Sequence, residues 1–320
     1  MSEQSSIAVI GLGIMGRRML TALATHEHFT ATHIWDPNAE AVAEAKAIAP
    51  HAIVPPTAEA AIEAADIVYL ACPPVPRRMY AMMAADCGKP LFLEKPLGVD
   101  LPASRSLVHH IEQAQVPAAV NFVQATGSAL TLIEAALAKG DMGALVGIDI
   151  HVTYPQWPRA WQMDADWLRL RAEGGMTREV ISHFVFFAER LMGTTHLNWS
   201  HPSYPDEVHC ETQLQASLSN HDGLPLNVFA AVGGMQPNRQ EIFVKGEQKS
   251  FVVREFSELW ESTGEAFAKS EGQDAEGRID GLHAQLDAFL KCIKGEPHKL
   301  ATVQEALSVQ EKIEGMLAGK

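Results

Sequence analysis

Short apolar segments alternate with amphipathic segments over the first 122 residues of the chain. The apolar segments cover residues 7–10, 32–35, 67–71, 90–93 and 118–122. Helical spacing is found between them, over residues 17–24, 39–48, 57–64, 77–85 and 104–115. The short segments are continuously apolar, which indicates strands buried on both faces. The pattern predicts an α/β domain whose parallel, doubly wound sheet is covered by helices.

After Gly127 the predicted strands follow one another without helices between them. A helix over residues 128–139 precedes strands over 146–154, 208–218, 226–232, 240–244 and 250–255. Residues 257–281 are polar and are predicted to form a loop. A helix over 279–293 follows, and the run from Thr302 to Glu305 has the capping-box pattern of a last helix. We expect residues 123–320 to form an α+β domain with a large, mostly antiparallel sheet, whose last helix can pack back on the first domain, residues 1–122.

Composition narrows the classes of partner. The hydrophobic share of 47% over 320 residues is that of a chain with a real core, and the net charge of −14 disfavours nucleic acid and anionic membrane surfaces. The four cysteines are dispersed and lack metal-ligand spacing, so we expect no metal site and a reducing, cytoplasmic location. The polar start of the sequence has no basic signal region, and no segment reaches the roughly 20 apolar residues of a membrane span.

A glycine motif follows the first predicted strand directly. In Gly11-Leu12-Gly13-Ile14-Met15-Gly16, the first glycine permits a tight turn, the second lets a pyrophosphate approach the backbone, and the third allows close packing of helix on strand. Asp36 ends the second strand about 20 residues later, where a carboxylate accepts hydrogen bonds from an adenosine ribose. The motif predicts a Rossmann-type dinucleotide-binding domain. Asp36 would repel a 2′-phosphate, which favours NAD(H) over NADP(H).

Lys95 stands at the end of a later apolar strand, in the run Leu91-Phe92-Leu93-Glu94-Lys95-Pro96. An amine at the carboxyl end of such a strand can exchange a proton with a substrate hydroxyl or steady an alkoxide. A plain exposed lysine at a strand end is the alternative interpretation. The cofactor residues predicted from the strand ends and the glycine motif are Gly11, Gly13, Ile14, Met15, Gly16, Asp36, Cys72, Pro73, Glu94 and Lys95.

The order of these motifs resembles the Gfo/Idh/MocA family of nicotinamide-dependent oxidoreductases over essentially the whole chain. Gly140-Asp141-Met142-Gly143 is similar to the glycine motif that precedes the first strand of that family's second domain, and Gly174-Gly175 stands ahead of a helix that carries His183. The resemblance implies that Glu94-Lys95-Pro96 is the family's Glu-Lys-Pro, with Lys95 contacting the substrate oxygen.

Many members of the family carry Asp-x-x-x-His on a helix facing the nicotinamide, and this chain has Glu179 and His183 at that spacing. Four-residue spacing places the two side chains on one helix face, which Phe186 would continue. We predict Lys95, His183 and Glu179 as catalytic residues, with His183 either the acid/base itself or the group that polarises the substrate; a structural bond between His183 and Glu179 is the alternative. Arg178 replaces a usual aliphatic residue and binds either a substrate anion or a surface carboxylate.

Aromatic residues are concentrated ahead of this helix, at Tyr154, Trp157, Trp161 and Trp167, with Arg159 among them. Flat indole faces suit sugar rings, although core or subunit packing explains them equally. Asn121 and Gln124 follow the last parallel strand, where substrates of such folds bind. The predicted substrate residues are Lys95, Asn121, Trp161, Arg178, Glu179 and His183.

These features predict an NAD(P)-dependent oxidoreductase that transfers hydride between nicotinamide and a carbonyl or hydroxyl carbon of a small polar substrate. The resemblance implies a sugar, polyol or derivative; an imine or oxo-acid substrate, a redox-neutral hydrolase or lyase with bound NAD, and a non-catalytic nucleotide sensor are the alternatives. We expect a homodimer or homotetramer formed through the second sheet, because helices would cover only one of its faces.

Overall fold

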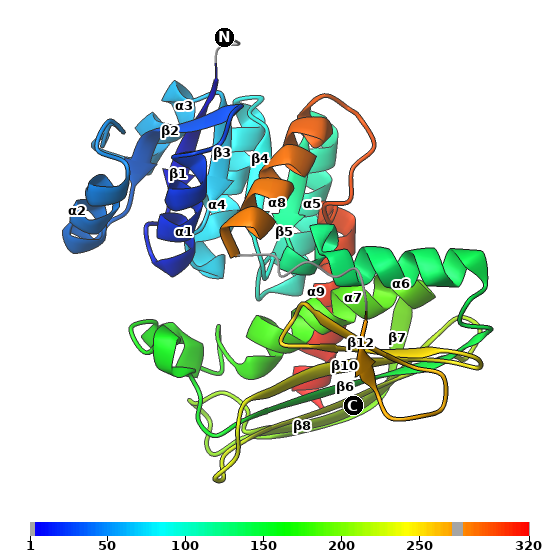
Figure 1. The fold of residues 1–320 in the computed structure, drawn as a ribbon. Coiled ribbons are helices and arrows are strands. Elements are labelled where there is room, and N and C mark those ends of the chain that lie inside the picture. The colour runs from blue at the N-terminus through cyan, green and yellow to red at the C-terminus, as the bar shows by residue number, and fades with distance from the viewer. Residues whose placement is uncertain (1–3, 271–277, 320) are drawn as a thin grey trace. The chain divides into compact units, whose positions relative to one another are not determined.

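The computed structural model describes residues 4–270 and 278–319, which form two compact units (Figure 1). The first unit consists of the described parts of Met1–Thr126 and Gly277–Leu307, and the second of Gly127–Glu276 and Ser308–Lys320. The first unit thus extends past the division expected at residue 122 and also includes a helix from near the end of the chain. The last helix begins in the first unit and ends in the second.

The first unit is built on a five-stranded parallel sheet with strand order β2-β1-β3-β4-β5. The strands are β1 Ser5–Ile10, β2 Phe29–Trp35, β3 Ile67–Leu70, β4 Leu91–Glu94 and β5 Ala118–Asn121. The helices between them are α1 Ile14–Leu23, α2 Ala39–Ile48, α3 Ala58–Ala64, α4 Pro74–Asp86 and α5 Leu101–Ala114. The strand order reverses between β1 and β3, so their carboxyl ends form the switch point at which such sheets bind ligands. The predicted doubly wound parallel sheet is confirmed.

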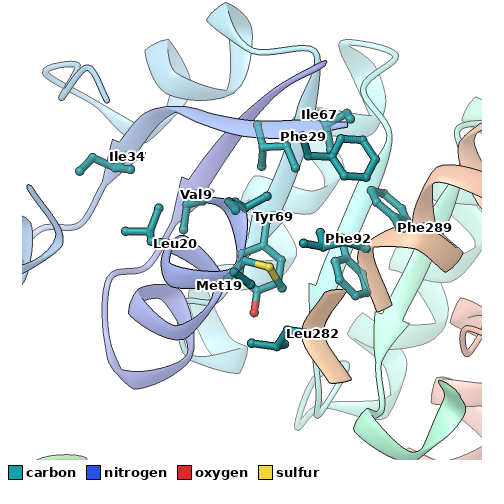
Figure 2. Packing of buried hydrophobic residues seen from close by; sticks show 14 of the residues in the cluster. Val9, Met19, Leu20, Phe29, Ile34, Ile67, Tyr69, Phe92, Leu282 and Phe289 are labelled. Carbon is teal, nitrogen blue, oxygen red and sulfur yellow. The ribbon is translucent and has the colours of Figure 1, made fainter. Parts of the chain in front are cut away.

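Helix α8, Arg278–Ile293, supplies part of the core of this unit (Figure 2). Its Phe289 ring stacks on Phe92 of β4 at a centroid distance of 4.9 Å and tilts against Phe29 of β2 at 6.4 Å. Leu282 and Leu286 are buried in the same cluster as Met19 and Leu20 of α1. Aromatic pairs of this kind contribute about 1 kcal/mol each beyond the area they bury. The core of this unit therefore requires a helix that begins more than 150 residues downstream of its last strand.

The second unit is built on an eight-stranded sheet with strand order β13-β12-β11-β10-β6-β9-β8-β7. The strands are β6 Leu145–Tyr154, β7 Thr195–Ser203, β8 Gln213–Asn220, β9 Pro225–Val232, β10 Arg239–Gly246, β11 Ser250–Arg254, β12 Glu258–Ser262 and β13 Ala268–Lys269. Only the β6–β9 pair is parallel, while every other pair recorded in this sheet is antiparallel. The predicted mostly antiparallel sheet is confirmed. Buried and exposed residues alternate along β8, because α6, Ser128–Lys139, and α7, Ser182–Met192, lie on one face of the sheet (Figure 1).

Three local predictions in this unit were wrong. The strand predicted over 208–218 begins only at Gln213, because the preceding residues form a loop joined to Leu170 by an isolated bridge at His209. The segment Thr195–Ser203 was not predicted as a strand, yet it forms β7 at the sheet edge. The loop predicted over 257–281 contains β12 and β13, while its residues 271–277 lie outside the described part of the chain. Among the described residues, no helix is long and apolar enough to cross a membrane.

Candidate active site

The glycine motif forms the turn between β1 and α1. A Cβ atom on Gly11 would lie 2.4 Å from the Cys72 nitrogen at the end of β3, and one on Gly16 would lie 2.0 Å from the Gly11 oxygen. These two glycines are therefore required by the packing of the protein itself. A Cβ on Gly13 would meet no atom of the described chain within 4 Å. Gly13 also begins α1 without a side-chain cap, so the first amides of the helix, those of Ile14 and Met15, face a space that suits an anion.

Asp36 holds this turn in place from the end of β2. One carboxylate oxygen accepts a hydrogen bond from the Leu12 amide at 2.7 Å, and the other accepts from the Asn38 amide at 2.8 Å. Each oxygen keeps further acceptor capacity for a ribose hydroxyl. Arg17 is occupied nearby, because its Nη1 donates to the Leu12 carbonyl at 2.8 Å and forms a 2.9 Å ion pair with Glu44. The turn and the carboxylate at its side therefore fit the phosphates and ribose of a dinucleotide.

Lys95 directly follows β4, and the backbone around it is fixed by Arg77 of α4. The guanidinium of Arg77 is buried and donates to three backbone carbonyls, those of Glu94, Pro96 and Cys72. It thus binds the chain on both sides of Lys95 and ties it to the end of β3. This role could not be predicted from the sequence, because an arginine bound to backbone carbonyls has no partner side chain to recognise. We assign Arg77 a positioning role for Lys95.

The side chain of Glu94 turns into the unit. Its Oε1 accepts hydrogen bonds from the Tyr69 hydroxyl and, at 2.7 Å, from the Asn121 amide nitrogen. Burial raises the pKa of Glu94, and these two donors work against that shift. Glu94 therefore braces the ends of β3, β4 and β5 against one another. The predicted cofactor role of Glu94 is indirect in this arrangement.

Two amide side chains near the end of β5 have unused hydrogen-bonding atoms. Within the described chain, the buried Oδ1 of Asn121 and both amide atoms of buried Gln124 have no hydrogen-bond partner. Buried polar atoms of this kind lower stability unless a ligand or water binds them.

Cys72 and Pro73 follow the end of β3. Cys72 is buried and burial raises the pKa of its thiol, which fits packing rather than nucleophilic chemistry. Pro73 is exposed at the start of α4.

Glu211 sets the start of the helix that carries Glu179 and His183 in the second unit. Its carboxylate accepts from the Thr177 amide at 2.7 Å and lies against Gly175, where a Cβ would come within 2.4 Å of it. Residues Thr177–Ile181 form a π-helical turn that leads into α7. Such wide turns are rare and often mark functional sites. Glu211 was predicted only as a strand residue, since its role depends on a contact that sequence spacing does not reveal.

Arg178 is buried and bonded to groups of the second unit. Its guanidinium forms two 2.7 Å hydrogen bonds with the carboxylate of Glu314 in the last helix, α9 Val303–Ala318, and donates to the carbonyls of Arg171 and Gly174. Both side chains of the ion pair are largely buried, with 8% and 15% exposed. This arrangement argues against both expectations for Arg178: it is neither placed to bind a substrate anion nor part of a surface salt bridge.

Glu179 lies in the π-helical turn, and His183 lies just after it in α7. The His183 ring meets Phe256 edge-on at 5.5 Å, and Phe256 stacks on Phe184 at 5.1 Å. Phe256 belongs to the turn between β11 and β12, where its φ of 69° is unusual for a residue with a side chain. Phe186, which was expected beside His183 on an open face, is instead fully buried. Phe256 is a contact of His183 that the sequence did not predict.

The aromatic residues between β6 and α7 gather around Arg159. Its guanidinium lies over the rings of Trp161, Tyr154 and Trp157 at 4.7, 5.5 and 5.9 Å, and its Nε donates to Gln162 at 2.8 Å. Trp161 is 44% exposed, so the predicted aromatic surface exists with a cation placed on it. In the described residues, no group of three or more histidine, cysteine, aspartate or glutamate side chains is arranged to hold a metal ion.

The family assignment follows from residues 5–122. They match the profile of the Gfo/Idh/MocA proteins, described as an oxidoreductase family with an NAD-binding Rossmann fold. This unit is the nucleotide-binding domain of the Gfo/Idh/MocA oxidoreductase family. The resemblance drawn from the glycine motif and Glu94-Lys95-Pro96 is confirmed, and the nucleotide of this Gfo/Idh/MocA domain is NAD or NADP.

Solved structures extend the likeness in fold to the whole length of the chain. An oxidoreductase from Agrobacterium radiobacter, in complex with NAD+, L-tartaric acid and magnesium, is 14% identical with a TM-score of 0.84 over 99% of this chain and 97% of its own. A protein from Desulfitobacterium hafniense proposed to be an NADPH-dependent oxidoreductase is 16% identical, with a TM-score of 0.84 over 99% and 96%. Levoglucosan dehydrogenase, in complex with NADH and levoglucosan, is 16% identical, with a TM-score of 0.85 over 99% and 98%. At these identities the likeness is one of fold, and a comparison with curated proteins finds no match.

Proposed function

We propose that the protein transfers hydride between a nicotinamide dinucleotide and the carbinol or carbonyl carbon of a small polyhydroxy compound. The observation that carries the proposal is the position of Lys95: it follows β4 of a nicotinamide-binding domain, and Arg77 fixes the backbone on both of its sides. A lysine placed in this way can hold a substrate oxygen while its proton moves. The bound nicotinamide supplies the hydride acceptor or donor.

Lys95 is proposed to accept the hydroxyl proton during oxidation and to return it during reduction. His183 is proposed either to carry the proton instead of Lys95 or to polarise the substrate, and Glu179 is proposed as a further catalytic residue on the same helix. The contact of Phe256 with His183 supports a defined orientation of the imidazole. These roles separate in kinetics, because the group that carries the proton sets the pH dependence of kcat.

NAD(H) is proposed as the preferred cofactor. A 2′-phosphate on the adenosine ribose would approach the carboxylate of Asp36, which already bonds two backbone amides. Arg17, which could have compensated its charge, is paired with Glu44. Like-charge repulsion without a compensating arginine disfavours NADP(H).

The substrate is proposed to be a sugar, a polyol or a derivative of one. Two of the structural relatives are complexes with polyhydroxy compounds, one with levoglucosan and the other with L-tartaric acid. One of these compounds is neutral and the other acidic, so the relatives do not decide the charge of the substrate.

A reducing compartment such as the cytoplasm is proposed as the location of the protein. Its support is that all four cysteines are free: Cys72, Cys87, Cys210 and Cys292.

A homodimer or homotetramer is proposed to form through the open face of the second sheet. Phe229 of β9 and Trp199 of β7 are 41% and 49% exposed, although aromatic residues are usually covered. Phe229 packs edge-on against His151 of the neighbouring strand β6 at 4.9 Å. Sedimentation equilibrium at micromolar concentration should show the assembly, and a monomer only would contradict it.

The proposed function is tested by measuring nicotinamide reduction with a panel of sugars, polyols and their acids. Lys95→Met should lower kcat by about 100-fold or more, since general acid–base groups contribute that much. Lys89→Met is the matched control, because the Lys89 ammonium donates to the Glu63 carbonyl on the surface of the same domain. Equal turnover by the Lys95→Met and wild-type proteins would refute the proposal. Product formed without net change in the nicotinamide would establish redox-neutral chemistry, and nucleotide binding without any turnover would favour a sensor.

A further inference from the structure

Arg159 is a half-buried cation in the second unit. Several other arginines of the unit pair with carboxylates, for example Arg178 with Glu314 at 2.7 Å and Arg239 with Glu241 at 2.6 Å. Arg159 forms no ion pair with a carboxylate of the described residues. Its Nε donates to the side chain of Gln162 at 2.8 Å.

The aromatic residues around Arg159 hold its guanidinium in place. It stacks over Trp161 at 4.7 Å and lies within 6 Å of the Tyr154 and Trp157 rings. Cation–π contacts attract the charge without neutralising it, and they leave the edge of the guanidinium plane for hydrogen bonding. Gln162 is itself buried, so the Nε bond fixes the direction in which the two Nη groups point. The two Nη groups therefore form a preorganised fork for an anion.

This cation belongs to the same cluster as the predicted catalytic carboxylate. Tyr154 interacts electrostatically with Arg159, with Glu255 and with Glu179, and Glu255 in turn interacts with Arg159. Glu255 does not neutralise the arginine through an ion pair; its Oε2 instead accepts from Gln240 at 2.9 Å. The next residue, Phe256, contacts His183. Arg159 is thus part of the surroundings of Glu179 and His183 within one unit.

We propose that Arg159 binds a carboxylate group of the substrate, so that the substrate is a hydroxy acid or sugar acid. One planar guanidinium fork matches one carboxylate in shape and charge. A phosphate ester carries nearly two negative charges, and Glu255, which interacts electrostatically with Arg159, disfavours the second charge. The exposed ring of Trp161 then covers the carbon chain next to the carboxylate. This inference rests on the proposed function, because it specifies the substrate of the same reaction.

The test compares three matched substrates: a neutral sugar or polyol, its carboxylate and its phosphate ester. The wild-type kcat/KM should favour the carboxylate by about tenfold or more over the neutral compound. Arg159→Gln should abolish that preference, because KM should rise much more for the acid than for the neutral compound. Arg159→Lys should restore only part of it, because the charge is kept and the fork is lost. Arg169→Gln is the control, since Arg169 lies in the same loop and pairs with Asp166 at 3.8 Å.

An unchanged acid preference in Arg159→Gln, or a wild-type preference for the neutral compound or the phosphate ester, would overturn the subsite and leave the proposed function standing. If no compound of the panel is turned over, the proposed function fails. Calorimetry with NAD and the sugar acid then decides the subsite independently: binding that depends on Arg159 supports it, and binding that is equal in Arg159→Gln, or absent, overturns it.

Discussion

Replacing Gly13 or Gly16 by alanine is expected to affect the stability of the protein to very different extents. A Cβ on Gly13 meets no atom within 4 Å, and its φ of −67° suits any residue. Gly13→Ala should therefore change the free energy of unfolding of the apo protein by less than about 1 kcal/mol. A Cβ on Gly16 lies 2.0 Å from the Gly11 oxygen, so Gly16→Ala should cost about 3 kcal/mol.

Although Gly13→Ala should hardly change stability, it should weaken cofactor binding. The Gly13→Ala methyl group occupies the space through which a pyrophosphate approaches the first amides of α1. The loss of about 2 kcal/mol of charge-assisted hydrogen bonding should raise the Kd for NAD about 30-fold. At an NAD concentration of about 100 times the wild-type Kd, the cofactor stabilises the wild type by about 2.7 kcal/mol and Gly13→Ala by about 0.9 kcal/mol. In a unit of this size these values correspond to Tm increases of about 5–10 °C and about 2–3 °C.

The assay is thermal unfolding of both variants with and without NAD, with the Kd measured by calorimetry. Gly13→Ala with an unchanged apo Tm and a reduced NAD shift would support the site. A full NAD shift in Gly13→Ala would refute the inference that the open space beside Gly13 receives the cofactor. A large loss of apo stability in Gly13→Ala would refute the geometry of the turn.

Three further predictions concern buried charges. Arg77→Met leaves three buried carbonyls without their donor and should lower the free energy of unfolding by about 3 kcal/mol in chemical denaturation; Arg77→Lys should retain more stability but still lower kcat, because Lys95 is less well held. Burial raises the pKa of Glu94 above 4.5, so the stability linked to its protonation is present below that pH and is lost as pH rises through the folded pKa. The Tm of Glu94→Gln should therefore fall less than that of the wild type as pH rises, and equal pH dependence of the two proteins would contradict this. Arg178→Met should cost about 3–5 kcal/mol by leaving Glu314 buried without its cation, and adding Glu314→Leu should recover most of the loss; substrate affinity lost without loss of stability would return Arg178 to the substrate site.

The first sheet was predictable almost strand by strand because its strands are continuously apolar and its helices fall between them. The edge strand β7 was missed because its sequence, Thr-His-Leu-Asn-Trp-Ser-His-Pro-Ser, mixes polar and apolar residues without a clear alternation. The strands β12 and β13 are short and lie in a polar stretch. Whether such a segment forms a strand depends on pairing with a neighbouring strand, and the pattern of a single sequence does not show which segment that neighbour is.

The residues of the candidate site also include some that the sequence predicts and others whose roles depend on contacts distant in the sequence. The turn that contains Gly11, Gly13 and Asp36 was predictable because a glycine motif directly after a buried strand is typical of such a turn, while the cofactor roles of these residues stay predictions. Arg178 was misjudged because a charged residue is expected at the surface unless its partner is known, and Glu314 is far away in the sequence. Arg77 was overlooked because its acceptors are carbonyls that every residue carries.

The proposed reaction requires that hydride passes directly between substrate and nicotinamide. The decisive measurement uses the substrate found in the panel, deuterated at its reacting carbon, with the reduced cofactor analysed by mass spectrometry. We expect one deuterium on the nicotinamide ring per molecule of cofactor reduced, with the rate of this transfer about 100-fold lower in Lys95→Met and unchanged in Lys89→Met. Reduced cofactor without deuterium, or product formed while the nicotinamide stays oxidised, would contradict it.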